Sequence, residues 1–529
     1  MIIHKEQIDV TLPNGQPGKK LIVSYVNDKG KIGFLNYLIP PEQMFEWKYT
    51  NKKYADPPFI ITDKDGNKKE VQWKSYDDKP VARKPCKVLP ENRLNELLCS
   101  FGAYIDPLFV MNVPDTWFCD IEVDVEDDFP EPEEARTPVN TIAMSKFPRV
   151  IVWSRKDLSD KEKDWIQDQI ENYSQNPELC TDETKRDITK GYKLEFRYFP
   201  DERSMLDNFL DFCKDVPAIA GWNFLNFDML YIRNRCLQNN LDFNKLSPTH
   251  NTTTFRITPR SGGATINLKL PMHKLIYDYL LVFKTWDMTV EHCENYKLDY
   301  IAKRVLGIGK KAHSWGFKDG YRDFFADYVF YQCIDSIILE QIDKELNTAK
   351  IWFMLASILR INAYDAFSTI NPVETVISNF IYEDYKVIPS MKHEVPEVQE
   401  SYAGAWVLPV NKSIVRYIGG LDFASLYPSI IRQFGVSPEK FLFKDTKVIG
   451  KNPDGTDKTV VGDYVPKEDE IKMKSGAVYK KGPAILPNIL THYYNLRKQA
   501  KNDRKDVDTE LAFYEKILEE REAGANLSS

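Results

Sequence analysis

The segment "TWFCDIEVDV" carries two carboxylates, Asp120 and Glu122, that could hold a metal ion. Side chains alternate between the faces of a β-strand, so these two acids share one face and their apolar neighbours take the other. Two carboxylates on one strand face cannot both be buried without compensating cations. Their oxygen atoms are the ligands that Mg²⁺ or Mn²⁺ prefers. A polar sheet edge would produce the same pattern, and this segment alone does not decide between the two.

Two later segments place further acids where they could serve the same chemistry. In "GWNFLNFDMLY", Asp228 stands at a predicted strand-to-helix junction, where a helix-capping aspartate is the alternative interpretation. In "YQCIDSIIL", Tyr331 and Asp335 are four residues apart and share one face of a predicted helix. Isoleucines flank Asp335, which predicts burial, and a buried acid needs a partner.

A framework of alternating strands and helices must position these side chains. "RVIVWS" and "AIAGWNF" predict buried strands, whereas "ERSMLDNFLDFCKD" and "FDMLYIRNRCLQNN" have helical spacing. A long helix is predicted over "RDFFADYVFYQCIDSIILEQIDKEL", followed by helical residues from about 349 to 385 that are interrupted at Pro372. At 529 residues the chain is too long for one core, so several domains are expected.

The composition excludes some classes of protein. The net charge of −7 excludes a uniformly basic nucleic-acid coat but not local binding through bound metal ions. The eight cysteines are scattered, which predicts neither a zinc site nor disulfides and favours a reducing cytoplasm. No apolar run approaches the ~20 residues of a membrane span, so no membrane partner is expected.

The order of the acidic segments resembles the exonuclease motifs of the DEDD superfamily, tyrosine subtype. An acid-x-acid strand, Asn-x3-Phe-Asp and Tyr-x3-Asp follow one another along the chain. The resemblance implies a 3′→5′ exonuclease in which four carboxylates hold two Mg²⁺ or Mn²⁺ ions. The residues that match its metal ligands are Asp120, Glu122, Asp228 and Asp335.

The same resemblance implies roles for other residues of the site. Tyr331 would orient the attacking water, and Asn223 and Phe227 would contact the terminal nucleotide. Asp278, in "LIYDYLLVFK", matches a further acidic position near the site.

The stretch "GGLDFASLYPSIIRQ" resembles motif A of the family B DNA polymerases. With "FCDIEVDVEDDFPEPEEARTPVNTIA", "GWNFLNFDMLYIRNR", "YKLDYIA" and "SYAGAWV", residues from about 100 to 505 are similar to the N-terminal part of that family, of the kind found in T-even-type tailed bacteriophages. The resemblance implies that Asp422 is a catalytic metal ligand. It also implies that the incoming deoxynucleoside triphosphate meets a turn formed by Ser425, Leu426 and Tyr427.

"YYNLRKQAKNDRKD" is similar to the first fingers helix of that family. Arg497 and Lys501 are four residues apart, so they share a helix face. An arginine suits bidentate phosphate contact and a lysine adds a point charge, so both would grip the triphosphate. A solvated charged helix would give the same pattern outside this context.

The predicted fold class is therefore mixed α/β and multidomain. Residues 1–105 form a β-rich N-terminal domain, and residues 106–345 form a ribonuclease-H-like 3′→5′ exonuclease domain. Residues 346–395 form helices that lead the chain back to the N-terminal domain, followed by a linker. Residues 396–482 form a partial palm with motif A and an exposed apolar surface, and residues 483–529 begin the fingers.

The sequence also departs from the family. It lacks the second fingers helix, the Asp-Thr-Asp-Ser loop with a second metal-binding aspartate, and the thumb. One aspartate is not enough for two-metal nucleotidyl transfer. The first hypothesis is an N-terminal portion or subunit of a replicative family B DNA-directed DNA polymerase, which needs a separate C-terminal chain for nucleotidyl transfer. A stand-alone single-strand exonuclease and a non-catalytic nucleic-acid-binding regulatory fragment are the alternatives.

The expected partners follow from the resemblance. They are a DNA primer–template, a single-stranded DNA 3′ end, the dNTP and the C-terminal polymerase chain, with a sliding clamp and RNA as further candidates. The expected location is the cytoplasm, which would be that of an infected bacterial host if the protein is phage-encoded.

Overall fold

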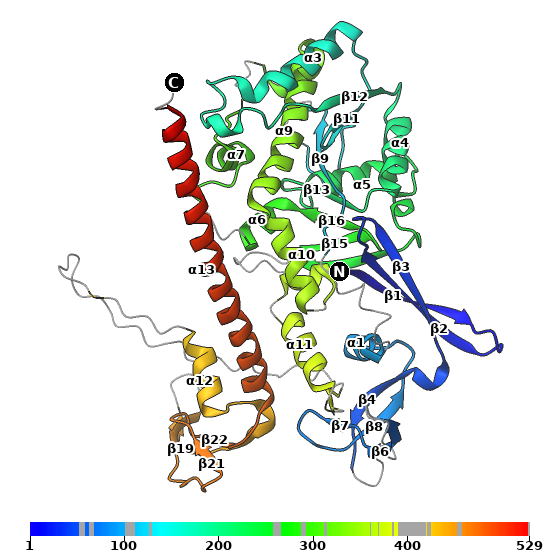
Figure 1. Ribbon diagram of the computed structural model, residues 1–529. Coiled ribbons are helices and arrows are strands. Elements are labelled where there is room, and N and C mark those ends of the chain that lie inside the picture. Colours follow the sequence, from blue (N-terminus) through cyan, green and yellow to red (C-terminus); the bar gives the residue numbers. More distant parts are fainter. Residues whose placement is uncertain are drawn as a thin grey trace. The chain divides into compact units, whose positions relative to one another are not determined.

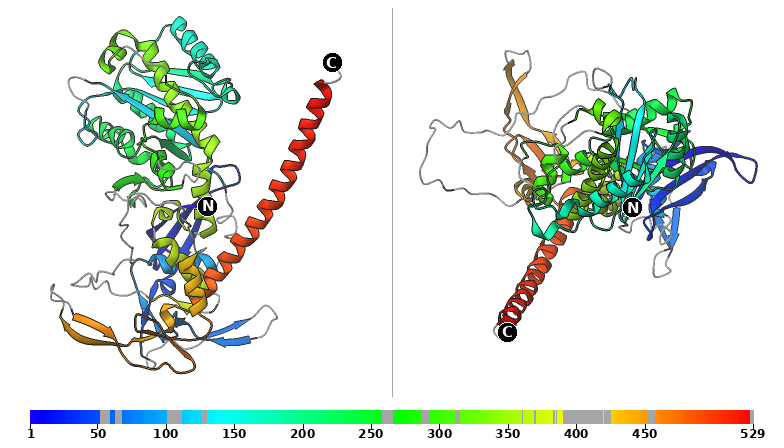
Figure 2. Two further views of the ribbon diagram at one scale, coloured as in Figure 1. Left: turned by 90° about the vertical axis from the view of Figure 1, so that its left-hand side faces the viewer. Right: turned by 90° about the horizontal axis from the view of Figure 1, so that it is seen from above.

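The computed structural model describes residues 1–51, 59–62, 68–100, 112–125, 130–257, 266–286, 293–310, 315–359, 361–368, 370–382, 384, 386–389, 419, 425–451 and 457–526. The chain divides into two compact units, one comprising residues 1–44 and 97–376 and the other residues 45–96 and 377–529 (Figures 1 and 2). One boundary lies just before β4 (Phe45–Tyr49), and the other two fall inside α1 (Glu91–Ser100) and α11 (Asn371–Tyr382). Residues 1–105, which the sequence prediction groups in one domain, are thus divided between the units.

A six-stranded sheet forms the centre of the first unit. Its order is β12-β11-β10-β9-β13-β16, with β9 antiparallel to β10 and parallel to β13. The strand bounds are β9 (Thr116–Val123), β10 (Val139–Lys146), β11 (Arg149–Ser154), β12 (Lys193–Tyr198), β13 (Ala218–Gly221) and β16 (Leu275–Asp278). β9 therefore lies inside the sheet and pairs with a strand on each side.

Helices from residues far apart in sequence pack against this sheet or against the helices that cover it. Their bounds are α3 (Asp160–Asn172), α4 (Glu202–Lys214), α5 (Asp228–Gln238), α6 (Tyr279–Trp286), α7 (Leu298–Leu306), α8 (Phe317–Asp323), α9 (Phe325–Leu346) and α10 (Thr348–Leu359). Most residues of α9 are buried, including the polar residues Gln332, Asp335 and Glu340. The helix predicted around Pro372 begins at Asn371 instead of breaking there, because proline is tolerated in the first turn of a helix.

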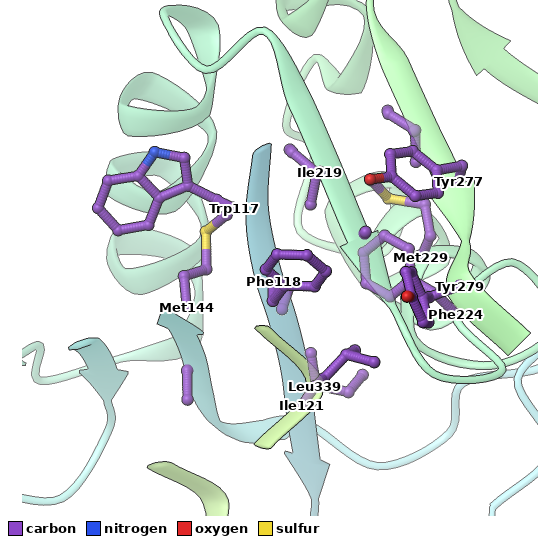
Figure 3. Close-up of a cluster of buried hydrophobic side chains, with 14 of the residues drawn as sticks. Trp117, Phe118, Ile121, Met144, Ile219, Phe224, Met229, Tyr277, Tyr279 and Leu339 are labelled. Atoms are coloured by element: carbon purple, nitrogen blue, oxygen red, sulfur yellow. The ribbon is translucent and has the colours of Figure 1, made fainter. Parts of the chain in front are cut away.

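The two faces of β9 contact different helices. The Trp117 ring packs edge-on against Phe212 of α4, with ring centroids 5.1 Å apart. The Phe118 ring points the other way and meets Tyr279 of α6 at 6.1 Å (Figure 3). Odd-numbered residues of β9 therefore face α4. Even-numbered residues, including both acids, face the opposite side of the sheet.

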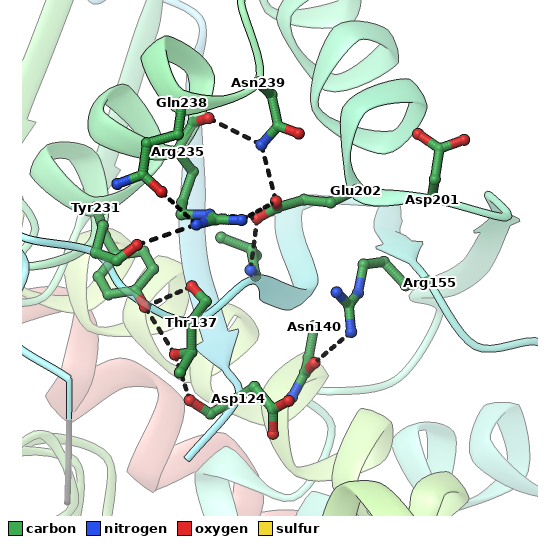
Figure 4. Close-up of polar contacts among 12 residues, drawn as sticks. Asp124, Thr137, Asn140, Arg155, Asp201, Glu202, Tyr231, Arg235, Gln238 and Asn239 are labelled. Carbon is green, nitrogen blue, oxygen red and sulfur yellow. Dashed lines mark hydrogen bonds and ion pairs between the residues drawn. The ribbon is translucent and has the colours of Figure 1, made fainter. Parts of the chain in front are cut away.

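A buried ion pair joins α4 to α5 in this unit. The Glu202 carboxylate accepts hydrogen bonds from the Val139 N–H at 2.8 Å and from Asn239 Nδ2 at 2.8 Å. It also accepts from Arg235 Nε at 2.8 Å and is paired with a second nitrogen of the same guanidinium (Figure 4). Both side chains are almost fully buried. The network therefore ties the first turn of α4, the start of β10 and the last turn of α5 together.

A three-stranded antiparallel sheet, β1 (Ile2–Thr11), β2 (Pro17–Val26) and β3 (Ile32–Ile39), packs on the same unit through a buried histidine. His273 Nε2 lies 2.8 Å from Glu6 Oε2, and its Nδ1 lies 2.9 Å from Ser24 Oγ. Asn251 Nδ2 donates to the other Glu6 oxygen at 2.6 Å, and the His4 ring lies 5.4 Å from the His273 ring. The histidine thus bonds both β1 and β2.

We expect this contact to weaken in acid. Burial lowers the pKa of His273 below its ordinary value of 6.5, so the unfolded chain binds a proton first as the pH falls. Burial alone would raise the pKa of Glu6, but hydrogen bonds from His273 and Asn251 hold it below its ordinary value, so its stabilisation is also lost in acid. Urea unfolding at about pH 7.5 and about pH 5.5, followed by a probe attached to the first unit, should show a smaller stability difference between the two pH values for His273→Asn than for the parent. Equal differences in the two proteins would contradict this assignment.

The second unit is built from short strands and one long helix. Its elements are β4 (Phe45–Tyr49), β5 (Phe59–Thr62), β6 (Lys68–Val71), β7 (Lys74–Ser75), β8 (Val81–Pro85), β17 (Lys386–Val387), α12 (Leu426–Phe434), β18 (Phe441–Lys444), β19 (Thr446–Lys451), β20 (Asp457–Val461), β21 (Glu470–Lys472), β22 (Ala477–Lys480) and α13 (Ile485–Asn526). All four residues of β18 are exposed, as are Val448, Ile449, Val460 and Val461. These side chains match the exposed apolar surface predicted for the partial palm.

Candidate active site

The acids of β9 lie on the strand face that turns away from α4. Cys119, Ile121 and Val123 are buried, whereas Asp120 and Glu122 are only half-buried. This is the alternation that the sequence predicts. Both acids therefore reach the same side of the sheet as the helix α9.

Helix α9 is held in register with β9 by one amide side chain. Gln332 Nε2 donates to the Asp120 carbonyl oxygen at 3.0 Å and to the Thr141 carbonyl oxygen at 3.3 Å. Gln332 is buried, and its position in the helix lies between Tyr331 and Asp335. The bond to the Asp120 backbone therefore fixes where the two residues predicted from "YQCIDSIIL" stand relative to the acids of β9.

Asp228 comes from a third element, the first residue of α5. Its Oδ1 accepts a hydrogen bond from the Ile121 N–H at 3.1 Å, so its carboxylate reaches β9 between the two strand acids. The N-cap position of α5 is Phe227, which makes no side-chain cap. The simple helix-cap interpretation of Asp228 therefore does not describe this residue.

Two predicted nucleotide-contacting residues precede Asp228. Asn223 is exposed and has φ +60°, a left-handed conformation that asparagine tolerates better than most residues. Its N–H donates to Asp278 Oδ1 at 3.1 Å, so the buried Asp278 shapes this turn from the end of β16. Phe227 is half-buried, and its ring lies 5.5 Å from the Tyr231 ring.

Lys310 brings a positive charge into the site. Its Nζ lies 2.6 Å from Asp335 Oδ2 and 3.3 Å from the Tyr331 hydroxyl. Burial works against this charge, yet Asp335 and then Tyr331 raise the pKa of Lys310 above its ordinary value. Lys310 was not predicted from the sequence, because neither lysine of "GIGKK" has a spacing signal that relates it to an acid 25 residues away.

The acids repel one another electrostatically. Burial, followed by the charges of Asp228, Glu122 and Asp335, raises the pKa of Asp120 well above its usual range. Burial and Asp335 raise the pKa of Glu122 to about 8, although Lys310 opposes this. Burial raises the pKa of Asp228 to about 7 against the hydrogen bond from Ile121. A site of this kind favours bound cations at neutral pH.

The donor set fits divalent metal ions in its chemistry. It is made of carboxylate oxygens, as Mg²⁺ and Mn²⁺ prefer, and its raised pKa values show that positive charge is in deficit. Within the described part of the chain, no three His, Cys, Asp or Glu side chains are placed to share one ion. The contacts account for this: Asp228 is bonded to the β9 backbone, and Asp335 is paired with Lys310.

The predicted polymerase residues belong to the second unit. Ser425 has φ +54° and ψ +51° and precedes α12, in which Leu426 and Tyr427 are exposed. Arg497 Nη1 of α13 donates to Ser425 Oγ at 3.3 Å. Lys501 lies one turn further along α13 and is exposed, whereas Asp422 lies outside the described residues.

Two family models match the chain. The model described as "DNA polymerase family B, exonuclease domain" matches residues 96–301, and "DNA polymerase family B" matches residues 370–523. Together they cover more than half of the sequence. The chain belongs to the family B DNA polymerases. Lys310, Tyr331 and Asp335 lie between the two matched segments, so family matching says nothing of them and their place in the site rests on the contacts above.

Relatives of this family B chain include phage and archaeal polymerases. The "DNA-directed DNA polymerase" of Escherichia phage RB69 is 28% identical over 398 residues, which are 72% of this chain and 41% of the relative. That of Enterobacteria phage T4 is 28% identical over 245 residues, 46% of this chain and 26% of the relative. "DNA polymerase 1" of Sulfurisphaera ohwakuensis is 25% identical over 359 residues, which are 63% of this chain and 36% of the relative. The chain therefore spans less than half the length of these relatives.

Proposed function

We propose that the first unit is a 3′→5′ exonuclease that removes nucleotides from single-stranded or frayed DNA ends, as the proofreading part of a replicative family B polymerase. The observation that carries this proposal is the convergence of acids from β9, α5 and α9 beside Tyr331 and Lys310. Mutual repulsion among the acids supports a metal-dependent reaction. The match to the family B exonuclease model supports the DNA substrate.

Each residue has a proposed task in this reaction. Two Mg²⁺ or Mn²⁺ ions, when bound, would supply an activated water and stabilise charge on the phosphate. Their ligands would be Asp120, Glu122, Asp228 and Asp335. Tyr331 orients the attacking water through its hydroxyl, whose position is set by Lys310. The Lys310 ammonium adds positive charge near the phosphate and offsets the carboxylates.

The residues before Asp228 are proposed to hold the DNA end. Asn223 is exposed on a turn that the Asp278 carboxylate supports through the backbone. Phe227, half-buried against Tyr231, would stack with the base of the terminal nucleotide. Stacking on an aromatic ring tolerates every base, as a nuclease without sequence preference needs.

The second unit is proposed to contribute part of a polymerase site. Its support is the bond from Arg497 to Ser425, which joins α13 to the turn before α12. In this proposal Asp422 holds metal, and Ser425, Leu426 and Tyr427 meet the dNTP. Two-metal nucleotidyl transfer needs a second carboxylate beyond these residues. A separate C-terminal chain that would supply this carboxylate stays a prediction. The same holds for the clamp and RNA partners and for the location in a bacterial host cytoplasm.

An assay of the isolated chain tests the exonuclease proposal. We expect the chain with Mg²⁺ to shorten a 5′-labelled single-stranded DNA one nucleotide at a time. A DNA whose 3′ end is blocked by a phosphorothioate linkage should resist shortening. Chelation of divalent ions should stop the reaction, because uncompensated carboxylates repel the phosphate. Binding of DNA without any metal-dependent shortening would favour the non-catalytic alternative instead.

No helix in the described residues is long and apolar enough to cross a membrane.

A further inference from the structure

The segment Gly307–Lys310 places Lys310 in the site, and the backbone of each of its four residues contacts another part of the chain. Gly307 ends α7 in a left-handed conformation, with φ +65°, and its carbonyl oxygen accepts from the Thr181 N–H at 2.9 Å. Ile308 forms a β-bridge with Cys180. Gly309 donates its N–H to the Leu179 carbonyl oxygen at 2.8 Å. The backbone before Lys310 is therefore held against residues 179–181.

The fourth of these backbone contacts, that of Lys310, is made with a side chain. The Lys310 N–H donates to Asp299 Oδ1 at 2.8 Å, and Asp299 Oδ2 lies 3.0 Å from Lys303 Nζ. Asp299 is the second residue of α7, so it reaches forward 11 residues to the end of the segment. The side chains of Asp299 and Lys303 are 37% and 59% exposed, whereas that of Lys310 is 17% exposed. The bond to the backbone is thus the inner of the two contacts of Asp299.

We propose that Asp299 is a positioning residue of the exonuclease site, which sets the backbone of Lys310 so that its ammonium reaches Asp335 and Tyr331. This inference rests on the proposed exonuclease function. One carboxylate oxygen fixes the Lys310 amide, and the lysine side chain then spans from that point to the α9 residues. Without the bond, the amide loses the partner that holds it, and the ammonium is no longer fixed beside the Tyr331 hydroxyl.

A different role for Asp299 would give a different pattern of effects. An acid in the first turn of a helix also stabilises the helix through its dipole, without any influence on Lys310. Asparagine distinguishes the two roles, because its side-chain oxygen can accept from the Lys310 N–H but carries no charge. The positioning role predicts that asparagine substitutes well and that alanine does not. The dipole role predicts that asparagine and alanine are equally poor.

Nucleotide release by a set of variants tests the proposal. We expect Asp299→Ala to lower kcat by about 10-fold or more, the size of effect typical for residues that orient a catalytic group. Asp299→Asn should restore most of the rate. Lys303→Met, which removes only the exposed partner of Asp299 and keeps the aliphatic stem, serves as the matched control and should not change the rate. Thermal unfolding of each variant verifies that it is folded.

Coupling to Lys310 gives the decisive comparison. If Asp299 acts through Lys310, then Asp299→Ala should cost nothing further in a Lys310→Met background. An equal loss in both backgrounds would overturn the positioning role.

A wild-type chain without nuclease activity would refute the proposed function, and the inference would then be decided by amide exchange. In ¹⁵N-lysine-labelled protein, the Lys310 amide should exchange faster in Asp299→Ala than in wild type or Asp299→Asn, and unchanged exchange would overturn it.

Discussion

The double variant Asp120→Ala, Glu122→Ala is expected to release nucleotides from a DNA 3′ end at least ~10³-fold more slowly than the parent chain. Metal ions contribute several kcal/mol of transition-state stabilisation, and each ~1.4 kcal/mol is a factor of ten in rate. Both acids lie on the face of β9 that points toward Asp335 of α9, and the charges of these carboxylates repel one another. Their removal takes away half of the proposed ligand set.

The same variant should not be less stable without metal. Burial and mutual repulsion disfavour the charged acids in the folded chain, so their loss relieves an unfavourable interaction. We expect a melting temperature in chelator equal to or above that of the parent. This readout separates loss of chemistry from loss of folding.

A carboxylate from the edge of the same sheet provides the control. Glu195 on β12 pairs with Arg149 and Arg197 and lies outside the proposed site. Glu195→Ala should keep the parent rate. If the Asp120 and Glu122 variant retained a rate within about tenfold of the parent while folded, the assignment of the metal ligands would be wrong.

Breaking the buried Glu202–Arg235 pair should cause the largest loss of stability. We expect Glu202→Gln to lower the free energy of opening around α4, α5 and β10 by about 3–5 kcal/mol, because it leaves the Arg235 guanidinium buried without its counter-charge. Hydrogen exchange of peptides from β10 and α5, followed by mass spectrometry, measures this locally (Figure 4). Local measurement is needed because the chain has two units that can unfold separately.

A surface ion pair serves as the comparison for that prediction. Arg322 Nη2 lies 2.9 Å from Asp319 Oδ1, and both side chains are more than half exposed. Asp319→Asn should leave the exchange of all these peptides unchanged, since exposed pairs contribute little. A comparable loss for Glu202→Gln and Asp319→Asn would show that burial of the Glu202 pair does not matter.

The grouping of acids within single elements of the first unit was predictable because local periodicity decides it. Alternation along β9 alone places Asp120 and Glu122 together, and a spacing of four alone places Tyr331 and Asp335 on one face of α9. The helix over residues 325–346 and the strands around it were likewise predictable, since apolar patterning sets which face is buried.

Contacts between distant segments were not predictable in the same way. The bond from Ile121 to Asp228, the placement of Lys310 on Asp335 and its anchor at Asp299 all join residues whose spacing carries no periodic signal. The division of residues 1–105 between two units is of the same kind.

By itself the sequence determined which acids share a strand or helix face, because backbone geometry repeats at fixed intervals of two and about 3.6 residues. Tertiary packing alone decided which of those faces meet, which lysine balances their charge, and that Asp228 reaches the β9 backbone. Those contacts depend on how separate elements pack in space, and no short-range pattern in the chain encodes such a distance.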